Sequence, residues 1–205
     1  MKVTPKLLLR VYKTLRVKYG HLNWWPGDTR FEIILGAILT QNTSWTNVEK
    51  AIAVLKKRGV LKAEAIHRMP EHELAGLIRS AGYFNIKANR IKNFTHYLYR
   101  VYNGSLSKMF QKPGKLLREE LLGVKGIGPE TADSILLYAG RKPFFVVDAY
   151  TKRVFSRHQF FHPTSSYDQV QAFFMTRLLP DTALYNDYHA QIVNLAKIHC
   201  FKKAS

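Results

Sequence analysis

One short segment, residues 122–132, constrains the fold of this chain more than any other. It reads Leu-Gly-Val-Lys-Gly-Ile-Gly-Pro-Glu-Thr-Ala, a tight turn with paired glycines between two helical patterns. Glycine tolerates positive φ and lets another backbone approach closely, and Pro129 suits the first turn of the second helix. The free N–H groups of that helix would face the turn and favour an anion such as a DNA phosphate. A plain connection between two helices is the alternative interpretation.

Apolar residues recur with helical spacing along nearly the whole chain, which predicts an all-α fold. The only extended segment that we predict is the apolar run at residues 143–147, which has no partner strand and is expected to be a buried connector. The predicted helices cover residues 5–19, 29–39, 44–58, 70–81, 86–102, 113–122, 129–139, 148–158, 166–179 and 181–200.

The charge of the chain predicts a polyanionic partner. Lys and Arg number 32 against 14 Asp and Glu, which gives a net charge of +18 spread along the sequence. Each cation that neutralises a phosphate releases condensed counterions, so nucleic acid is the favoured partner; a need for high solubility would be a simpler explanation. No run approaches the roughly 20 apolar residues of a membrane helix, and Cys200 is the only cysteine. We therefore expect a cytoplasmic protein without membrane contact.

A single carboxylate ends the apolar run that follows the hairpin segment. Asp148 comes directly after Phe144-Phe145-Val146-Val147. An acid in such a place is either a helix N-cap or a desolvated functional group. Taken alone, the position favours the N-cap.

Together these features resemble the helix-hairpin-helix, endonuclease III-like superfamily of DNA glycosylases. The hairpin is followed by Pro143, Val147-Asp148 and Arg153-Val154, and is preceded by Leu39-Thr40-Gln41-Asn42-Thr43. His189 and Cys200 fall where the family has a histidine and its first cluster cysteine. The resemblance covers roughly residues 25–200. It implies a two-lobed all-α fold with a central cleft: a six-helix barrel lobe at residues 30–141 that includes the hairpin, and a second lobe from residues 1–29 plus 142–205 that carries the catalytic aspartate.

We expect the chain to act as a monomer on double-stranded, nucleoid-associated DNA with a damaged base, in the way that the resemblance implies. The nucleotide is flipped out and its N-glycosidic bond is cut, with Asp148 as the catalytic carboxylate and Gln41 as the wedge in the emptied stack. The hairpin that would grip phosphate, and could hold a monovalent cation through its carbonyls, comprises Gly123, Val124, Lys125, Gly126, Ile127 and Gly128. Further candidate phosphate contacts are Lys152, Arg153 and Arg157; solvated surface charge is the alternative for each.

Two departures from the family pattern limit the expected chemistry. Glu130 occupies the position of the lysine that forms a Schiff base in bifunctional members, so we expect hydrolysis without AP lyase activity; rescue by Lys125 is the less favoured alternative. Iron–sulfur clusters need four thiolates, and the 205 residues contain one cysteine. We therefore expect no cluster, no other cofactor and no firm metal site.

The tryptophans suggest which base is removed. Trp24, Trp25, Pro26 and Trp45, with the Thr40–Thr43 run, resemble the 3-methyladenine DNA glycosylase branch, which lacks the cluster. Indole rings stack well on a cationic ring such as an alkylated purine, although packing between helices would also explain them. The branch uses a C-terminal lysine in its pocket, and Lys197, Lys202 and Lys203 are the candidates. A glycosylase for uracil, mismatched or oxidised bases, and a non-catalytic damaged-DNA-binding protein, remain alternatives.

Overall fold

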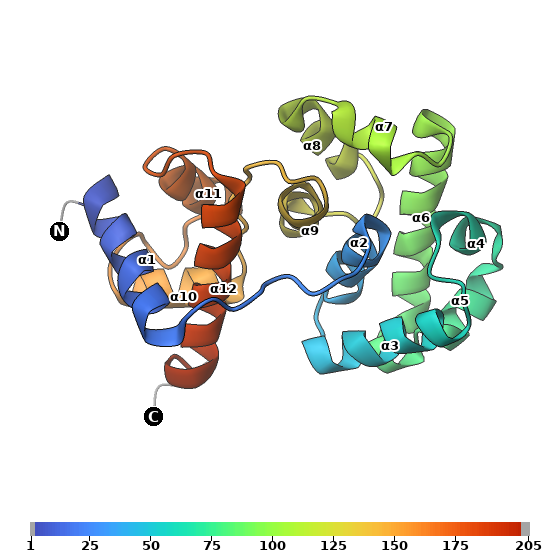
Figure 1. Cartoon of the computed structure of the whole chain (residues 1–205), viewed down its shortest axis with the longest axis horizontal. Helices are drawn as coiled ribbons and strands as arrows, with labels where there is room; N and C mark the ends of the chain where they lie inside the picture. The colour runs from blue at the N-terminus through green and yellow to red at the C-terminus, as the bar shows by residue number, and fades with distance from the viewer. Residues whose placement is uncertain (1–2, 202–205) are drawn as a thin grey trace. The chain divides into compact units, whose positions relative to one another are not determined.

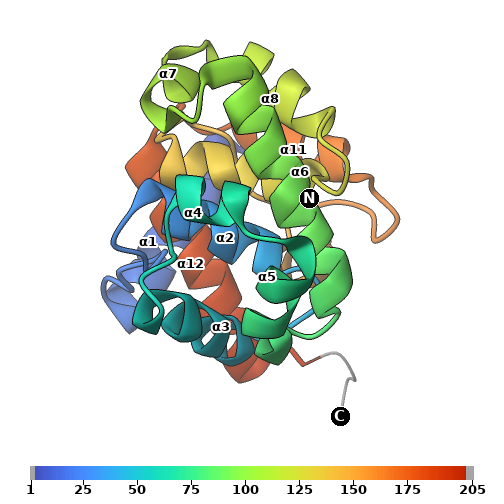
Figure 2. The same cartoon turned by 90° about the vertical axis from the view of Figure 1, so that its right-hand side faces the viewer.

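A computed structural model describes residues 3–201, and every regular element in that stretch is helical. The described residues form twelve α-helices, which are labelled in Figure 1 and seen from the side in Figure 2. The chain divides into two compact units, Gly27–Gly140 and Met1–Pro26 with Arg141–Ser205. The all-α prediction is confirmed for the described residues. None of the helices there has both the length and the apolar character needed to cross a membrane.

Helix α2 lies at the centre of the unit Gly27–Gly140. Its side chains are nearly all buried, and it packs against α6, α9 and the π-helical turn Ile135–Ala139. Thr29 caps its first turn by accepting a hydrogen bond from the backbone N–H of Glu32 at 3.1 Å, as a β-hydroxyl at this position favours. The α-helices of this unit are α2 (Arg30–Leu39), α3 (Trp45–Lys57), α4 (Ala63–Arg68), α5 (Glu71–Leu77), α6 (Phe84–Tyr102), α7 (Leu106–Gln111), α8 (Gly114–Leu122) and α9 (Pro129–Ser134).

The unit formed by the two ends of the chain is built on an aromatic core. Phe145 stacks on Phe174 with ring centroids 4.1 Å apart, and Tyr188 lies edge-on to both. Each such ring that leaves water contributes roughly 1.5–3 kcal/mol, so this cluster anchors the unit. Its helices are α1 (Pro5–Tyr19), α10 (Ala149–Arg157), α11 (Tyr167–Met175) and α12 (Thr182–His199).

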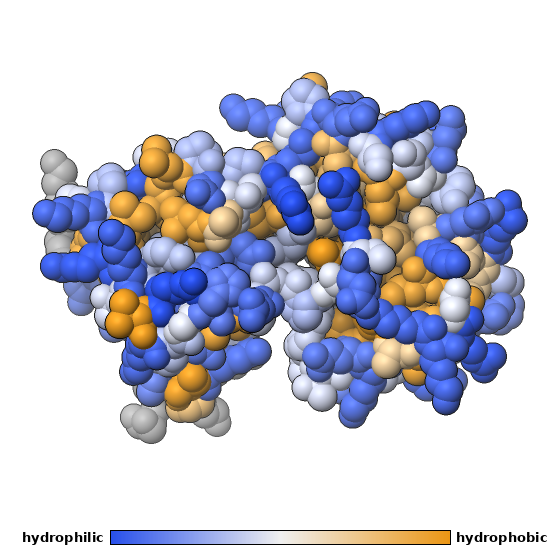
Figure 3. Space-filling model, in the orientation of Figure 1, coloured by the Kyte–Doolittle hydropathy of each residue, from blue (hydrophilic) through white to orange (hydrophobic). Residues whose placement is uncertain are grey.

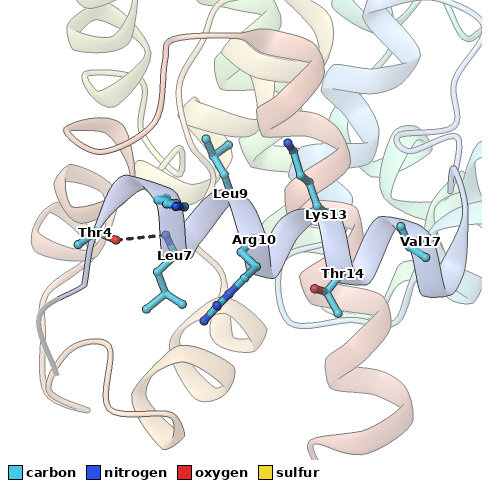
Figure 4. Close-up of a pocket in the computed structure, with 8 residues that line it drawn as sticks. Thr4, Leu7, Leu9, Arg10, Lys13, Thr14 and Val17 are labelled. Atoms are coloured by element: carbon cyan, nitrogen blue, oxygen red, sulfur yellow. Dashed lines mark hydrogen bonds between the residues drawn. The ribbon is translucent and has the colours of Figure 1, made fainter.

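Helix α1 is fastened to α12 by polar contacts as well as by packing. The Tyr188 hydroxyl donates to the Leu8 carbonyl at 2.9 Å, and the Tyr12 hydroxyl donates to Asp187 at 2.7 Å. Burial and the neighbouring Asp187 raise the pKa of Tyr12 to about 12. At its start, Thr4 accepts from the backbone N–H of Leu7 (Figure 4). The N-terminal helix is therefore an integral part of this unit.

The predicted extended segment is present and is a buried connector rather than a strand. Residues 143–147 form no ladder, and Phe145, Val146 and Val147 are buried. The Gln171 amide donates to the Phe145 carbonyl at 2.8 Å, which satisfies one backbone group that a sheet would otherwise have paired. This fixed connector leads directly into Asp148.

The element boundaries differ from the predicted ones in several places. The helix predicted at 70–81 is α5 followed by a 3₁₀ turn at Arg79–Ala81. Helices α4 and α7, of six residues each, were not predicted because such short segments show little periodicity. The helix predicted at 166–179 ends at Met175, where turns follow. The last turn of the helix predicted at 129–139 is π-helical, an arrangement that is common as a single turn within an α-helix.

Candidate active site and DNA-binding hairpin

Asp148 is both a helix N-cap and a largely buried carboxylate. Its Oδ1 accepts from the backbone N–H of Thr151 at 2.7 Å, which caps α10. Its Oδ2 lies 3.4 Å from Nε2 of His189 on α12, and the Asp148 side chain is 13% exposed. The two interpretations that the sequence left open are therefore compatible: one oxygen caps the helix while the other faces a buried imidazole.

The surroundings of Asp148 hold it in the ionised form. Burial alone would raise the pKa of this carboxyl, but the adjacent His189 and the hydrogen bond from Thr151 outweigh burial and lower its pKa below the ordinary 3.8. The dipole of α10 acts in the same direction, because the carboxylate sits at the helix N-terminus. A largely buried carboxylate with a lowered pKa is suited to stabilising positive charge that develops on a nearby group.

Aromatic rings border the Asp148–His189 pair. The Trp24 ring lies edge-on to His189 with centroids 6.2 Å apart, and Trp25 lies at right angles to Trp24 at 5.8 Å. Lys197 places its ammonium 5.9 Å above the Trp24 ring. Of the three candidate pocket lysines, Lys197 is therefore beside the tryptophans, while Lys202 and Lys203 lie outside the described residues.

The other two residues that we predicted for the base pocket are Pro26 and Trp45. Pro26 is exposed at the end of its unit. Trp45 opens α3 in the other unit, and its indole N–H donates to Glu49 on the same helix at 2.8 Å. Within the unit of the two chain ends, the structure groups Trp24 and Trp25 with His189 and Asp148. Trp45 belongs to the other unit, and its place in the base pocket stays a prediction.

The hairpin has the geometry that the glycine pattern predicts. Gly126 has a φ of +96°, Gly128 precedes α9 in extended conformation, and Pro129 is the first residue of that helix. Val124 and Ile127 are buried and anchor the turn, whereas Lys125 is exposed. Gly123 forms the C-cap of α8. Backbone N–H groups at the start of α9 are thus presented at an exposed glycine, as a phosphate site requires.

A buried ion pair fixes the two helices of the hairpin. Arg118 on α8 binds Asp133 on α9 through two hydrogen bonds of 2.7 and 3.0 Å, and the Asp133 side chain has no exposed surface. Bidentate pairing sets the angle between guanidinium and carboxylate. Neither residue was singled out from the sequence, because their partnership is visible only once the two helices are packed.

Gln41, the predicted wedge, is bound to the hairpin within its own unit. Its amide nitrogen donates to the Gly126 carbonyl at 3.1 Å and to the Thr131 hydroxyl at 2.8 Å. Its amide oxygen accepts from Nη1 of Arg90 on α6. The Gly126 and Lys125 carbonyls, two of the proposed cation ligands, already accept side-chain hydrogen bonds from Gln41 and Asn93.

The three cations on α10 that we predicted as phosphate contacts donate hydrogen bonds to other groups of the protein. Lys152 donates to the Ser165 carbonyl at 2.8 Å, and Arg153 donates to the Cys200 carbonyl at 2.7 Å. Arg157 donates to the Cys200 sulfur and to the Phe201 carbonyl. These cations hold the segment after α12, so any contact with phosphate would have to use their remaining donors. Glu130, in contrast, is exposed in the first turn of α9.

Two buried lysines were missed by the sequence reading. Lys87 is 1% exposed and donates to the carbonyls of Leu39 and Ala81 at 2.8 and 2.7 Å. Lys92 donates to backbone carbonyls at the end of α4. Both cations satisfy carbonyls at helix ends, which have no partner within the helix. Their position within the amphipathic pattern of α6 was the only signal that could have revealed them.

The surface hollow along α1 is separate from these groups. It is lined by Leu7, Leu9 and Val17 with the basic Lys6, Arg10 and Lys13 (Figure 4). Neither Asp148 nor the tryptophans contribute to it. Hydrophilic side chains also project from much of the face drawn in Figure 3, in keeping with the charge of +18.

Solved structures share this fold. A 3-methyladenine DNA glycosylase of Helicobacter pylori, solved with bound 1,N6-ethenoadenine, superposes with a TM-score of 0.83 at 29% identity and covers 95% of this chain and 98% of its own. A structure of an endonuclease III–DNA covalent intermediate superposes with a TM-score of 0.82 at 20% identity, covering 99% and 91% of the two chains. The second likeness is evidence for the fold alone.

Sequence comparison gives the family. A provisionally named DNA repair glycosylase of Methanocaldococcus jannaschii is 47% identical over 201 residues, 97% of this chain and 91% of the relative. Endonuclease III of Sulfolobus acidocaldarius is 30% identical over 171 residues, 82% and 74% of the two chains. The profile of the HhH-GPD superfamily base excision DNA repair proteins matches residues 35–180. The chain therefore belongs to the HhH-GPD superfamily of base excision DNA repair proteins.

Proposed function

We propose that this protein is a monofunctional DNA glycosylase that hydrolyses the N-glycosidic bond of alkylated purines such as 3-methyladenine. The observation that carries the proposal is the largely buried Asp148 carboxylate, whose pKa is lowered by His189 beside Trp24. The likeness at 29% identity to a 3-methyladenine DNA glycosylase supports the choice of lesion.

The reaction assigns Asp148 a defined role. The bond between C1′ of the sugar and the base nitrogen breaks, the electron pair leaves with the base, and positive charge develops on the sugar. A fixed carboxylate stabilises that charge, and it can accept a proton from the water that attacks C1′. The departing base needs no proton, because a cationic alkylpurine becomes neutral when it takes the electron pair of the broken bond.

The tryptophans support a cationic base as the substrate. The Lys197 ammonium lies 5.9 Å from the centroid of the Trp24 ring, and the same kind of attraction would hold a cationic base against an indole ring. Cation–π attraction contributes about 0.5–2 kcal/mol. Alkylation at N3 or N7 places positive charge on the purine and weakens its glycosidic bond, so a carboxylate and water suffice for hydrolysis.

Strand cleavage should not accompany base release. A Schiff base needs an amine near C1′, and the hairpin position used by bifunctional relatives holds Glu130. Borohydride reduction traps such an imine as a covalent protein–DNA adduct. We expect no adduct with the wild-type protein; an adduct that disappears in Lys125→Gln would assign lyase chemistry to Lys125 instead.

The deciding experiment measures free bases released from methylated duplex DNA by wild type and Asp148→Asn. Asparagine is also a good N-cap, so this variant keeps the hydrogen bond from Thr151 and should fold. We expect release of 3-methyladenine by wild type and a loss of at least about 100-fold in the variant.

Asp181→Asn is the matched control, because Asp181 caps α12 in the same unit. It should retain activity. Release of uracil or oxidised bases with no alkylpurine would keep the role of Asp148 and replace the lesion. Tight binding of damaged duplex without release of any base would favour the non-catalytic alternative.

A further inference from the structure

Helix α6 presents a line of three polar residues to the Gln41 turn and the hairpin. Lys87, Arg90 and Asn93 are spaced by three and lie on one face of the helix. Lys87 holds the Leu39 carbonyl at the end of α2, Arg90 holds Gln41, and the Asn93 amide donates to the Lys125 carbonyl at 3.1 Å. One helix face therefore positions both the predicted wedge and the hairpin.

Gln41 is bound through both the nitrogen and the oxygen of its amide in this arrangement. A glutamine amide has two N–H donors and one acceptor oxygen. The donors bind the Gly126 carbonyl and the Thr131 hydroxyl, and the oxygen binds the Arg90 guanidinium. Entry of this side chain into a duplex requires all three hydrogen bonds to break. The charge-assisted one, from Arg90, is the strongest of the three.

Arg90 also lies directly against the hairpin turn, the predicted phosphate site. A methyl group built on Gly126 would come within 2.3 Å of Arg90 Cγ and 3.2 Å of its Nε. Within residues 3–201, Gln41 is the hydrogen-bond partner of the guanidinium, which leaves further N–H donors available. A phosphate held at the hairpin would meet this guanidinium, and a charged phosphate oxygen is a stronger acceptor than a neutral amide oxygen.

We propose that Arg90 is a positioning residue that exchanges Gln41 for DNA phosphate. In the free protein its guanidinium holds Gln41 against Gly126. When phosphate reaches the hairpin, the guanidinium transfers to the phosphate, and Gln41 is released to enter the stack. The proposal rests on the proposed function in that Gln41 serves as the wedge, but its test does not require base excision.

The test is a double-mutant cycle on affinity for undamaged duplex DNA, measured as a function of salt. In Gln41→Ala the Arg90 guanidinium is already free. We therefore expect DNA binding to tighten by about fivefold, which corresponds to the net contribution of one modest hydrogen bond. Arg90→Met should weaken DNA binding and reduce the slope of log K against log salt by about 0.9, which is the contribution of one phosphate contact. In the Arg90→Met background, Gln41→Ala should no longer tighten binding.

Arg68→Met is the matched control, because it removes the same charge from an exposed site paired with Glu64. It should leave the salt slope unchanged. Gln41→Glu provides a second variant: a carboxylate should retain Arg90, and so weaken DNA binding with a reduced slope. Thermal unfolding of each variant identifies any that fail to fold.

Insertion of Gln41 is followed separately by 2-aminopurine fluorescence beside a stable abasic analogue. We expect the signal to depend on Gln41 and to survive Arg90→Met once DNA is saturating. Weaker binding by Gln41→Ala, or equal effects of Gln41→Ala with and without Arg90, would overturn the exchange. A protein that shows the exchange but releases no alkylpurine would instead refute the proposed function.

Discussion

At the scale of single residues, Asp148 combines two demands that usually conflict. A carboxylate removed from water tends to take up a proton, yet one that stabilises a cationic transition state must stay charged. The Thr151 N–H, the start of α10 and the buried His189 supply the missing solvation. The capping interaction is thus part of the electrostatics of the candidate active site.

Replacing His189 by glutamine tests this balance. The pKa of Asp148 is lowered in the folded protein. Its carboxylate therefore stays mostly charged at pH 3.8, the ordinary pKa, and loses its charge only as the pH falls further. Without His189, burial becomes the dominant influence and the pKa rises. We expect the acid limb of base release, measured by single-turnover kinetics between about pH 4 and pH 8, to move to higher pH.

His158→Gln is the control for that experiment, because His158 is an exposed residue at the end of α10 in the same unit. Its pH profile should match wild type. An acid limb that stays in place in His189→Gln would show that the imidazole does not set the charge of Asp148.

Lys87 gives a second prediction at this scale. Burial, with a smaller effect of Arg90, lowers its pKa from 10.5 to about 8. Between these values the unfolded chain binds more protons than the folded one, so this residue makes the free energy of unfolding rise with pH. Lys87→Met should remove this pH dependence of the unfolding free energy. It also leaves two helix-end carbonyls unpaired, which should lower the unfolding free energy by about 1–3 kcal/mol.

Denaturant unfolding of wild type and Lys87→Met at about pH 7.5 and pH 10 tests this prediction. The gap in unfolding free energy between wild type and Lys87→Met should widen at the higher pH. A gap that stays constant would mean that Lys87 keeps its proton in the folded state.

At the scale of elements, the two hairpin glycines have different tasks. Gly126 has positive φ and lies against the Arg90 side chain, whereas a methyl group on Gly128 would meet nothing within 4 Å. Gly126→Ala should therefore destabilise the protein by about 1–3 kcal/mol. Gly128→Ala should leave stability nearly unchanged but weaken DNA binding, because its methyl group would stand between phosphate and the N–H groups of α9.

Thermal unfolding and duplex binding, measured on both variants, separate the two effects. Gly128→Ala with wild-type affinity would show that phosphate does not approach this part of the hairpin.

The elements that the sequence predicted well are those with long periodic patterns or with glycine and proline residues at their ends. The hairpin could be placed because its glycines and Pro129 specify backbone conformation locally, and Asp148 because it ends an apolar run. Arg90, Arg118 and Lys87 could not be placed, because each is defined by a partner distant in the sequence. Polar residues within an amphipathic helix give no signal until the helices are packed.

At the scale of the whole molecule, a charge of +18 on 205 residues sets the affinity for a polyanion before any specific contact forms. Several of the cations are nevertheless committed to the fold, as Lys152 and Arg153 show by binding backbone carbonyls. Net charge therefore overstates the number of phosphates that the protein can neutralise. The number must be measured from the salt dependence of binding.

That measurement also tests where the DNA binds. Each phosphate contact contributes about 0.9 to the slope of log K against log salt, so Lys125→Gln, at the exposed tip of the hairpin, should reduce the slope by about that amount. Lys57→Gln removes the same charge from the exposed end of α3 and should shift affinity slightly without changing the slope. If the two variants gave equal slopes, the hairpin would contribute only to the general field of the protein, and the phosphate site would have to be sought among its other cations.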